Sequence, residues 1–210
     1  MTSSISPWPA SAPEVAAQPA FDIRALYRRV RGASTAGDAV TTVLHLGDEH
    51  TLLASGTDAM APSVVLTLAL GRLKTAREFF RGDLPLPLEL ETAIAQVEDE
   101  VYTAHVGHRS WVPQGALVVP YATDPALHDI ASLAGVGLGV QRILTLDAME
   151  RLFNRLAAVS EGRPAAHEGL PASAPFAATL LVLRELMHHL PFKTLILLPP
   201  TDAARQFKWK

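Results

Sequence analysis

The chain has 210 residues, 49% of them hydrophobic, which is enough for one domain with a sizeable core. It contains no cysteine, which excludes a disulfide framework, a thiolate metal site and a cysteine nucleophile, and which is typical of a cytoplasmic protein. The net charge of -3 gives no basic field for nucleic acid or an anionic membrane, and no apolar run is long enough to span a bilayer.

The start of the chain is rich in Ser, Ala and Pro and lacks the positive and apolar regions of a secretory signal. We expect residues 1–20 to form a disordered tail, residues 21–200 to form a single lobe and residues 201–210 to form a C-terminal tail.

Apolar residues recur at helical spacing between Phe21 and Gly32, which predicts a first helix. Three β-rich runs follow, at 40–46, 51–54 and 63–68. Their connections are too short for a crossover between parallel strands, so we predict an antiparallel meander.

The remainder of the chain alternates helices with strands. The predicted helices span 71–80, 88–104, 125–133, 146–158 and 175–190. The predicted strands span 116–119 and 194–198, and residues 135–139 are interpreted as a flexible glycine-bearing connection. A meander followed by this alternation indicates an α/β layered fold.

Several strings in this order resemble the exopolyphosphatase and guanosine pentaphosphate phosphatase family. They are DIRALY at 22–27, LGRLKTAREFF at 70–80 and LDAMERLFNRL at 146–156. The family has the actin-like superfold and divides its active site between two lobes. The resemblance implies one actin-like (ribonuclease H-like) lobe, similar to the second lobe of the family.

The family's phosphate loop corresponds to residues 45–51. Only Gly47 is retained there, and Asp48 and Glu49 stand at the next two glycine positions. Glycines let successive backbone N–H groups converge on an anion, and a carboxylate beside a phosphate is repulsive. We therefore expect phosphate or polyphosphate binding to be disfavoured.

The acidic groups that hold a divalent cation in the family are also replaced, by His45 and Leu52. The family's second glycine turn falls at 121–123, where only Thr123 matches. The resemblance thus implies no cofactor, with magnesium relevant only to an active enzyme. The predicted remnant of the phosphate loops comprises His45, Gly47, Asp48, Glu49, His50, Thr51 and Thr123.

Asp22 stands where the family's proposed general base lies, and general-base work requires hydrogen-bond reach to the attacking water. Alternatively, Asp22 caps the first helix. His45 and His50, together with Asp48 or Glu49, offer ligands for zinc or another transition metal, or else are exposed turn residues.

Two further histidine pairs lie near predicted helix ends. His105 and His108 are expected at the end of a helix, where Gly107 and Pro113 indicate that a loop follows. His188 and His189 are expected to interact with the C-terminus of the last long helix.

Three functions are open. The leading one is an exopolyphosphatase-related domain that lacks efficient hydrolysis and serves binding, regulation or assembly, as a homodimer that covers exposed apolar surface. The second is an active metal-dependent phosphatase with Asp22 as base. The third is an unrelated α/β interaction domain, which a fold without the leading meander would support.

Overall fold

The computed structural model describes residues 21–34, 37–112, 114–190 and 192–200. The tails predicted at 1–20 and 201–210 lie outside the described residues. No described helix combines the length and the apolarity that a membrane crossing requires.

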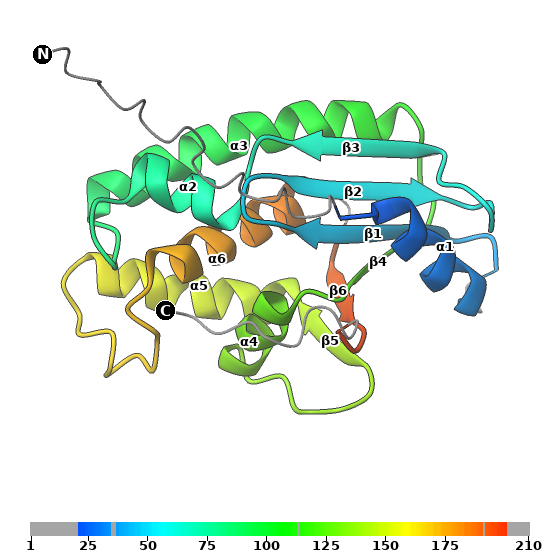
Figure 1. The fold of residues 1–210 in the computed structure, drawn as a ribbon. Helices are drawn as coiled ribbons and strands as arrows, with labels where there is room; N and C mark the ends of the chain where they lie inside the picture. The colour runs from blue at the N-terminus through cyan, green and yellow to red at the C-terminus, as the bar shows by residue number, and fades with distance from the viewer. Residues whose placement is uncertain (1–20, 35–36, 113, 191, 201–210) are drawn as a thin grey trace, which may run out of the picture.

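The three leading strands form the predicted antiparallel meander (Figure 1). β1 spans Val40–Leu46, β2 spans Thr51–Gly56 and β3 spans Val64–Leu68. The pairing of β1 with β2 ends at Leu46 opposite Thr51, so residues 47–50 alone form the connecting turn.

The meander continues into a parallel part of one six-stranded sheet of order β3-β2-β1-β4-β6-β5. β4 (Val118–Ala122) runs parallel to β1, and β6 (Thr194–Leu197) runs parallel to β4. β5 (Arg142–Thr145) is an antiparallel edge strand beside β6 that the sequence does not predict. Its four residues carry little local signal, because strand formation depends on the neighbouring strand.

The segment before β5 is held by Arg142, which is 4% exposed. Its guanidinium donates hydrogen bonds to the carbonyl oxygens of Val136 at 2.7 Å and Gly137 at 3.1 Å. The interpretation of residues 135–139 as a flexible connection is therefore corrected to a segment tied down by a buried arginine.

Helices cover both faces of the sheet (Figure 1). α1 (Ile23–Ala33) packs its apolar stripe against Val43 and Ala54 on one face. The other face is covered by α6 (Ala174–His189), which is apolar nearly all round because it lies among α2 (Arg72–Phe79), α3 (Pro87–Arg109) and α5 (Leu146–Ser160). α4 (Pro125–Leu133) follows β4 directly.

α3 is longer than predicted and continues to Arg109. His105 and His108 therefore lie in the last two turns of the helix, as helix-terminus histidines, and the loop expected from Gly107 begins only after Arg109. Gly107 does not end the helix, since a helical glycine costs only about 1 kcal/mol. The side chain of Leu66 packs against it, 3.3 Å from where a Cβ would lie.

Candidate functional site

The turn between β1 and β2 lies where the sequence places the phosphate loop. The amide of Gly47 donates to the carbonyl of His50 at 3.0 Å, which closes the hairpin. This donor is therefore used within the turn, whereas a phosphate cradle needs its backbone N–H groups free to converge on the anion.

The same turn also fills the N-terminus of α2. Arg72 N–H donates to the carbonyl of Gly47 at 2.9 Å, and the amides of Leu73 and Lys74 both donate to the carbonyl of Asp48 at 3.0 Å. The first amides of a helix lack partners within the helix and commonly bind anions. Here backbone carbonyls of the turn take that place.

This contact requires Gly71, which the sequence reasoning does not single out as a site residue. A Cβ at Gly71 would lie 2.3 Å from the carbonyl oxygen of Asp48 and 2.4 Å from the carbonyl carbon of Glu49. No other residue type allows such close approach of two backbone segments. Gly71, more than Gly47, is therefore the glycine on which the turn depends.

The two acidic side chains of the turn are paired with arginines of α2. Asp48 Oδ1 lies 2.6 Å from Nε of Arg72, and Glu49 accepts two hydrogen bonds from Arg77, at 3.0 and 3.3 Å. The hydrogen bonds from Arg77 lower the pKa of the Glu49 carboxyl. The carboxylates thus fasten the turn to α2, in contrast to the expected orientation toward an anion.

The two threonines of the predicted loops are buried. Thr51 donates its hydroxyl proton to the carbonyl of Leu70 at 2.7 Å, beside the Gly71 contact. Thr123 is 4% exposed at the end of β4. His50 is exposed in the turn. The structure thus brings Thr51 to the junction with α2, while Thr123 lies at the neighbouring strand.

His45, at the end of β1, meets a residue that the sequence reasoning misses. Its Nδ1 lies 2.5 Å from Oδ1 of Asp124, and its ring stacks on Phe21 with 3.6 Å between centroids. Asp124 stands at the N-cap position of α4 but makes no capping bond with its side chain. Its Oδ2 is buried without a hydrogen-bond partner among the described residues. The sequence feature that could have revealed this pair is that both residues lie near the ends of strands, β1 and β4, which pair in parallel.

Asp22 caps α1 as the alternative interpretation expects. Its Oδ1 accepts a hydrogen bond from the amide of Ala25 at 2.9 Å, and Asp22 itself is exposed. It is the chain neighbour of Phe21, so it lies beside the His45 end of the site.

Within the described ranges, no group of three or more His, Asp or Glu side chains is arranged to hold a metal ion. Asp48 and Glu49 are paired with arginines of α2. A magnesium ion, or the zinc ion that His45 and His50 would have shared with one of these carboxylates, would have to displace an arginine, so the turn as it stands does not fit either metal.

Comparison with known proteins gives a fold but no sequence relative, because neither a protein-family model nor a curated protein matches the chain. Among solved structures, a PPX-GPPA enzyme of Aquifex aeolicus superposes with a TM-score of 0.63 at 15% identity, over 82% of this chain and 57% of that chain. An exopolyphosphatase from Cytophaga hutchinsonii superposes with a TM-score of 0.63 at 11% identity, over 84% and 58%.

The chain spans less than three fifths of either enzyme. The leading meander, whose absence would have supported an unrelated α/β domain, is present, and the strand order and these superpositions agree with the fold that the resemblance implies. The resemblance seen in the sequence is confirmed at the level of the fold: this chain has the actin-like α/β fold of one part of the Ppx/GppA exopolyphosphatases.

Proposed function

We propose that this chain is an exopolyphosphatase-related domain that lacks efficient phosphohydrolase activity and serves binding, regulation or assembly. The observation that carries the proposal is the contact between the turn and α2. The carbonyl groups of Gly47 and Asp48 accept hydrogen bonds from the amides that open α2.

The hydrogen bonds between the turn and α2 disfavour the binding of an anion at this junction. A phosphate entering this junction must replace the carbonyl groups at the start of α2 and must also approach the turn past Asp48 and Glu49. Breaking the existing bonds leaves the carbonyl groups of two half-buried residues without these donors, which costs about 0.5–1.5 kcal/mol for each hydrogen bond. Phosphate binding here is therefore disfavoured against the closed arrangement.

We expect no metal-dependent phosphate release from polyphosphate or guanosine pentaphosphate above the background of heat-denatured protein. The assay is colorimetric phosphate release with magnesium, manganese or zinc, and an active exopolyphosphatase serves as the positive control. Steady turnover that Asp22→Ala abolishes, with His167→Gln unaffected, would contradict the proposal. His167 is an exposed histidine outside the site.

The active phosphatase is kept as a second candidate because of one observation. Asp124 is 6% exposed and its Oδ2 lacks a partner among the described residues, although a buried carboxylate oxygen ordinarily accepts a hydrogen bond. In this function His45 and Asp124 would orient a substrate beside Asp22. Loss of turnover in both Asp22→Ala and Asp124→Asn would distinguish it from the leading proposal.

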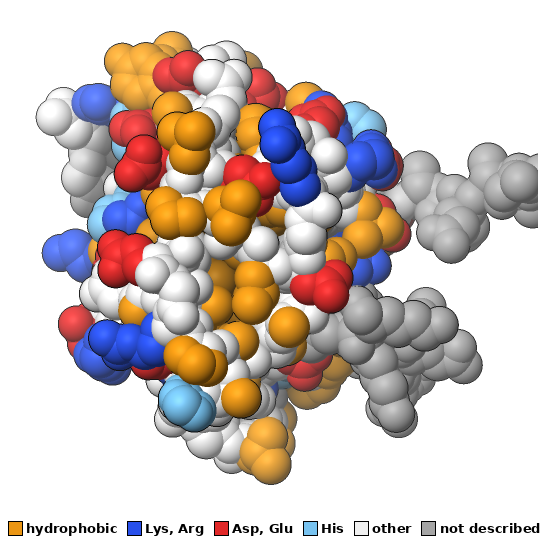
Figure 2. Space-filling model, turned by 90° about the vertical axis from the view of Figure 1, so that its left-hand side faces the viewer, with side chains coloured by type: hydrophobic (Ala, Val, Ile, Leu, Met, Phe, Trp, Pro, Cys, Tyr) orange, Lys and Arg blue, Asp and Glu red, His pale blue; other side chains and the backbone are white. Residues whose placement is uncertain are grey.

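The proposed assembly is a homodimer formed through the connection between α2 and α3. Figure 2 shows apolar side chains gathered in a band on the side of the molecule that carries this connection. Leu86 and Leu88 are 60% and 73% exposed there. Contiguous exposed apolar surface is typical of an interaction site, and two copies related by a twofold axis would cover it.

Light scattering after size exclusion is expected to give twice the chain mass of 22.5 kDa. Leu88→Asp is expected to give a monomer, because a dimer would bury an unpaired carboxylate. Leu138→Asp is the matched control, since Leu138 is 92% exposed on the connection before β5. A monomeric wild-type chain at micromolar concentration would exclude the dimer.

A further inference from the structure

A cavity of about 290 Å³ lies at the ends of α3 and α6, next to the start of β4. Its polar lining consists of His105, His108, Arg109, Gln114, His188 and His189, and apolar side chains complete it. None of the described lining residues is acidic. The polar groups that face a ligand are therefore neutral or cationic.

His108 is the most unusual member of this lining. It is 0% exposed, both of its ring nitrogens lack hydrogen-bond partners among the described residues, and its ring meets Phe192 edge-on. Nδ1 of His105, one turn earlier, is also buried without a partner. Buried polar atoms are nearly always hydrogen-bonded, so these nitrogens mark unused hydrogen-bonding capacity in the wall of the cavity.

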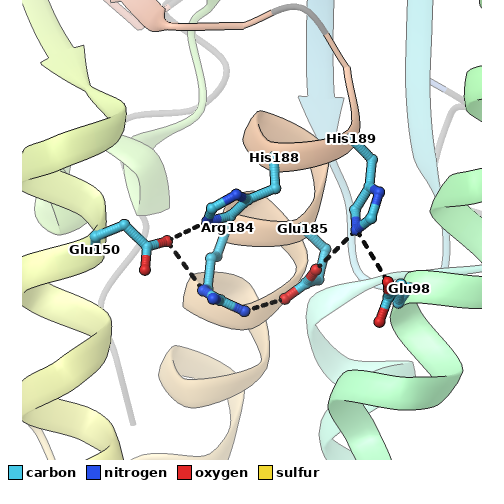
Figure 3. Close-up of polar contacts among 6 residues, drawn as sticks. All are labelled: Glu98, Glu150, Arg184, Glu185, His188 and His189. Atoms are coloured by element: carbon cyan, nitrogen blue, oxygen red, sulfur yellow. Dashed lines mark hydrogen bonds and ion pairs between the residues drawn. The ribbon is translucent and has the colours of Figure 1, made fainter.

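Carboxylates behind the cavity orient the two histidines of α6 (Figure 3). His188 Nε2 lies 2.5 Å from Oε1 of Glu150, and His189 Nε2 lies 3.4 Å from Glu185 and 3.5 Å from Glu98. A carboxylate only accepts, so Nε2 of His188 carries the proton and donates to Glu150, while Nε2 of His189 lies in ion-pair range of its two carboxylates. This arrangement leaves Nδ1 of each ring without a carboxylate partner among the described residues.

An arginine pairs with two of these three carboxylates. Arg184 lies between two of them, with Nε 3.0 Å from Glu150 and a terminal nitrogen 2.5 Å from Glu185 (Figure 3). Their negative charge is thus shared with Arg184, His188 and His189. Arg109, at the end of α3, supplies positive charge on the cavity side.

We propose that this cavity binds a small organic anion, a carboxylate or a phosphate ester. Arg109, His188 and His189 bind its charged group, and His105 and His108 form the wall beside it. The volume lies at the lower end of the range for ligand pockets, so the ligand is a small metabolite-sized molecule. A planar guanidinium paired with imidazoles matches the oxygens of a carboxylate or phosphate group.

This site is independent of the turn between β1 and β2. The cavity contacts Val118 at the start of β4, whereas the turn follows the carboxyl end of β1, which runs parallel to β4. The two sites therefore lie at opposite ends of the strands. Loss of phosphate binding at the turn does not imply loss of ligand binding in the cavity.

Isothermal titration calorimetry near neutral pH tests the proposal with three probes: succinate, inorganic phosphate and 1,4-diaminobutane. We expect saturable one-site binding of at least one anion and none of the diamine. Binding of succinate alone assigns a carboxylate, and binding of phosphate alone assigns a phosphate ester. Arg109→Gln and His188→Gln are each expected to weaken binding by about tenfold.

His167→Gln is the control and should bind like the wild type, because His167 is exposed away from the cavity. Circular dichroism and thermal melting confirm that each variant is folded, and Arg109 is exposed, so its replacement leaves the core intact. Absence of binding by both anions, preference for the diamine, or wild-type affinity in both Arg109→Gln and His188→Gln overturns the proposal.

Discussion

Gly71→Ala is expected to lower the free energy of unfolding by about 3 kcal/mol, because the added methyl group meets backbone that has no room to give. The Cβ would lie 2.3 Å from the carbonyl oxygen of Asp48 and 2.4 Å from the carbonyl carbon of Glu49. The backbone of Gly71 itself, at φ -143° and ψ 156°, suits any residue. The expected cost therefore comes from the clash alone.

Urea denaturation of the variant and the wild type measures this change. Gly137→Ala is the matched control, since a Cβ at Gly137 meets nothing within 4 Å and its φ lies outside the left-handed region. Gly137→Ala is expected to change stability by less than about 1 kcal/mol. Equal stability of the two variants would show that the turn and α2 are not in close contact.

The second large effect is a loss of stability in mild acid caused by His108. Burial, with a smaller contribution from the charge of His105, lowers the pKa of His108 from 6.5 to about 4. The unfolded chain therefore binds more protons than the folded chain between these values. The free energy of unfolding is therefore unaffected by His108 above pH 6.5. It decreases as the pH falls from 6.5 to 4, by about 3 kcal/mol in all.

Urea denaturation at a series of pH values checks this expectation. His108→Leu is expected to remove most of the slope between pH 6.5 and 4, because the variant has no imidazole to protonate on unfolding. At neutral pH it should be close to wild-type stability, since it removes two unpartnered buried nitrogens. His167→Gln should retain the slope. An unchanged slope in His108→Leu would refute the assignment.

Local sequence patterns predict most of the fold. The meander follows from three β-rich runs with short connections, and α4 is predicted with its observed bounds, Pro125–Leu133. Thr145, a residue type that favours the N-cap position, precedes α5, and its hydroxyl oxygen accepts a hydrogen bond from Ala148 N–H at 3.1 Å. These features depend on residues close together in the chain, which is why sequence alone is sufficient.

The features that sequence misses depend on contacts between distant residues. β5 forms only because β6 offers an edge, and the role of Gly71 appears only when residues 48–49 lie against it. Asp124 has the appearance of an ordinary helix cap before Pro125, and only the parallel pairing of β1 with β4 brings it to His45. The ion pairs between the turn and α2 could not be predicted either, because Glu49 and Arg77 are far apart in the sequence and meet only in the folded chain.

The central claim is that the turn at residues 47–50 is closed against phosphate. Two-dimensional NMR of the ¹⁵N-labelled chain, titrated with tripolyphosphate and magnesium, tests it residue by residue. We predict that the amide resonances of Gly47 and Gly71 stay in place at millimolar ligand. Shifts confined to Gly107 and Gly115 belong to the separate cavity between α3 and α6. A saturable shift of Gly47 and Gly71 together would contradict the account.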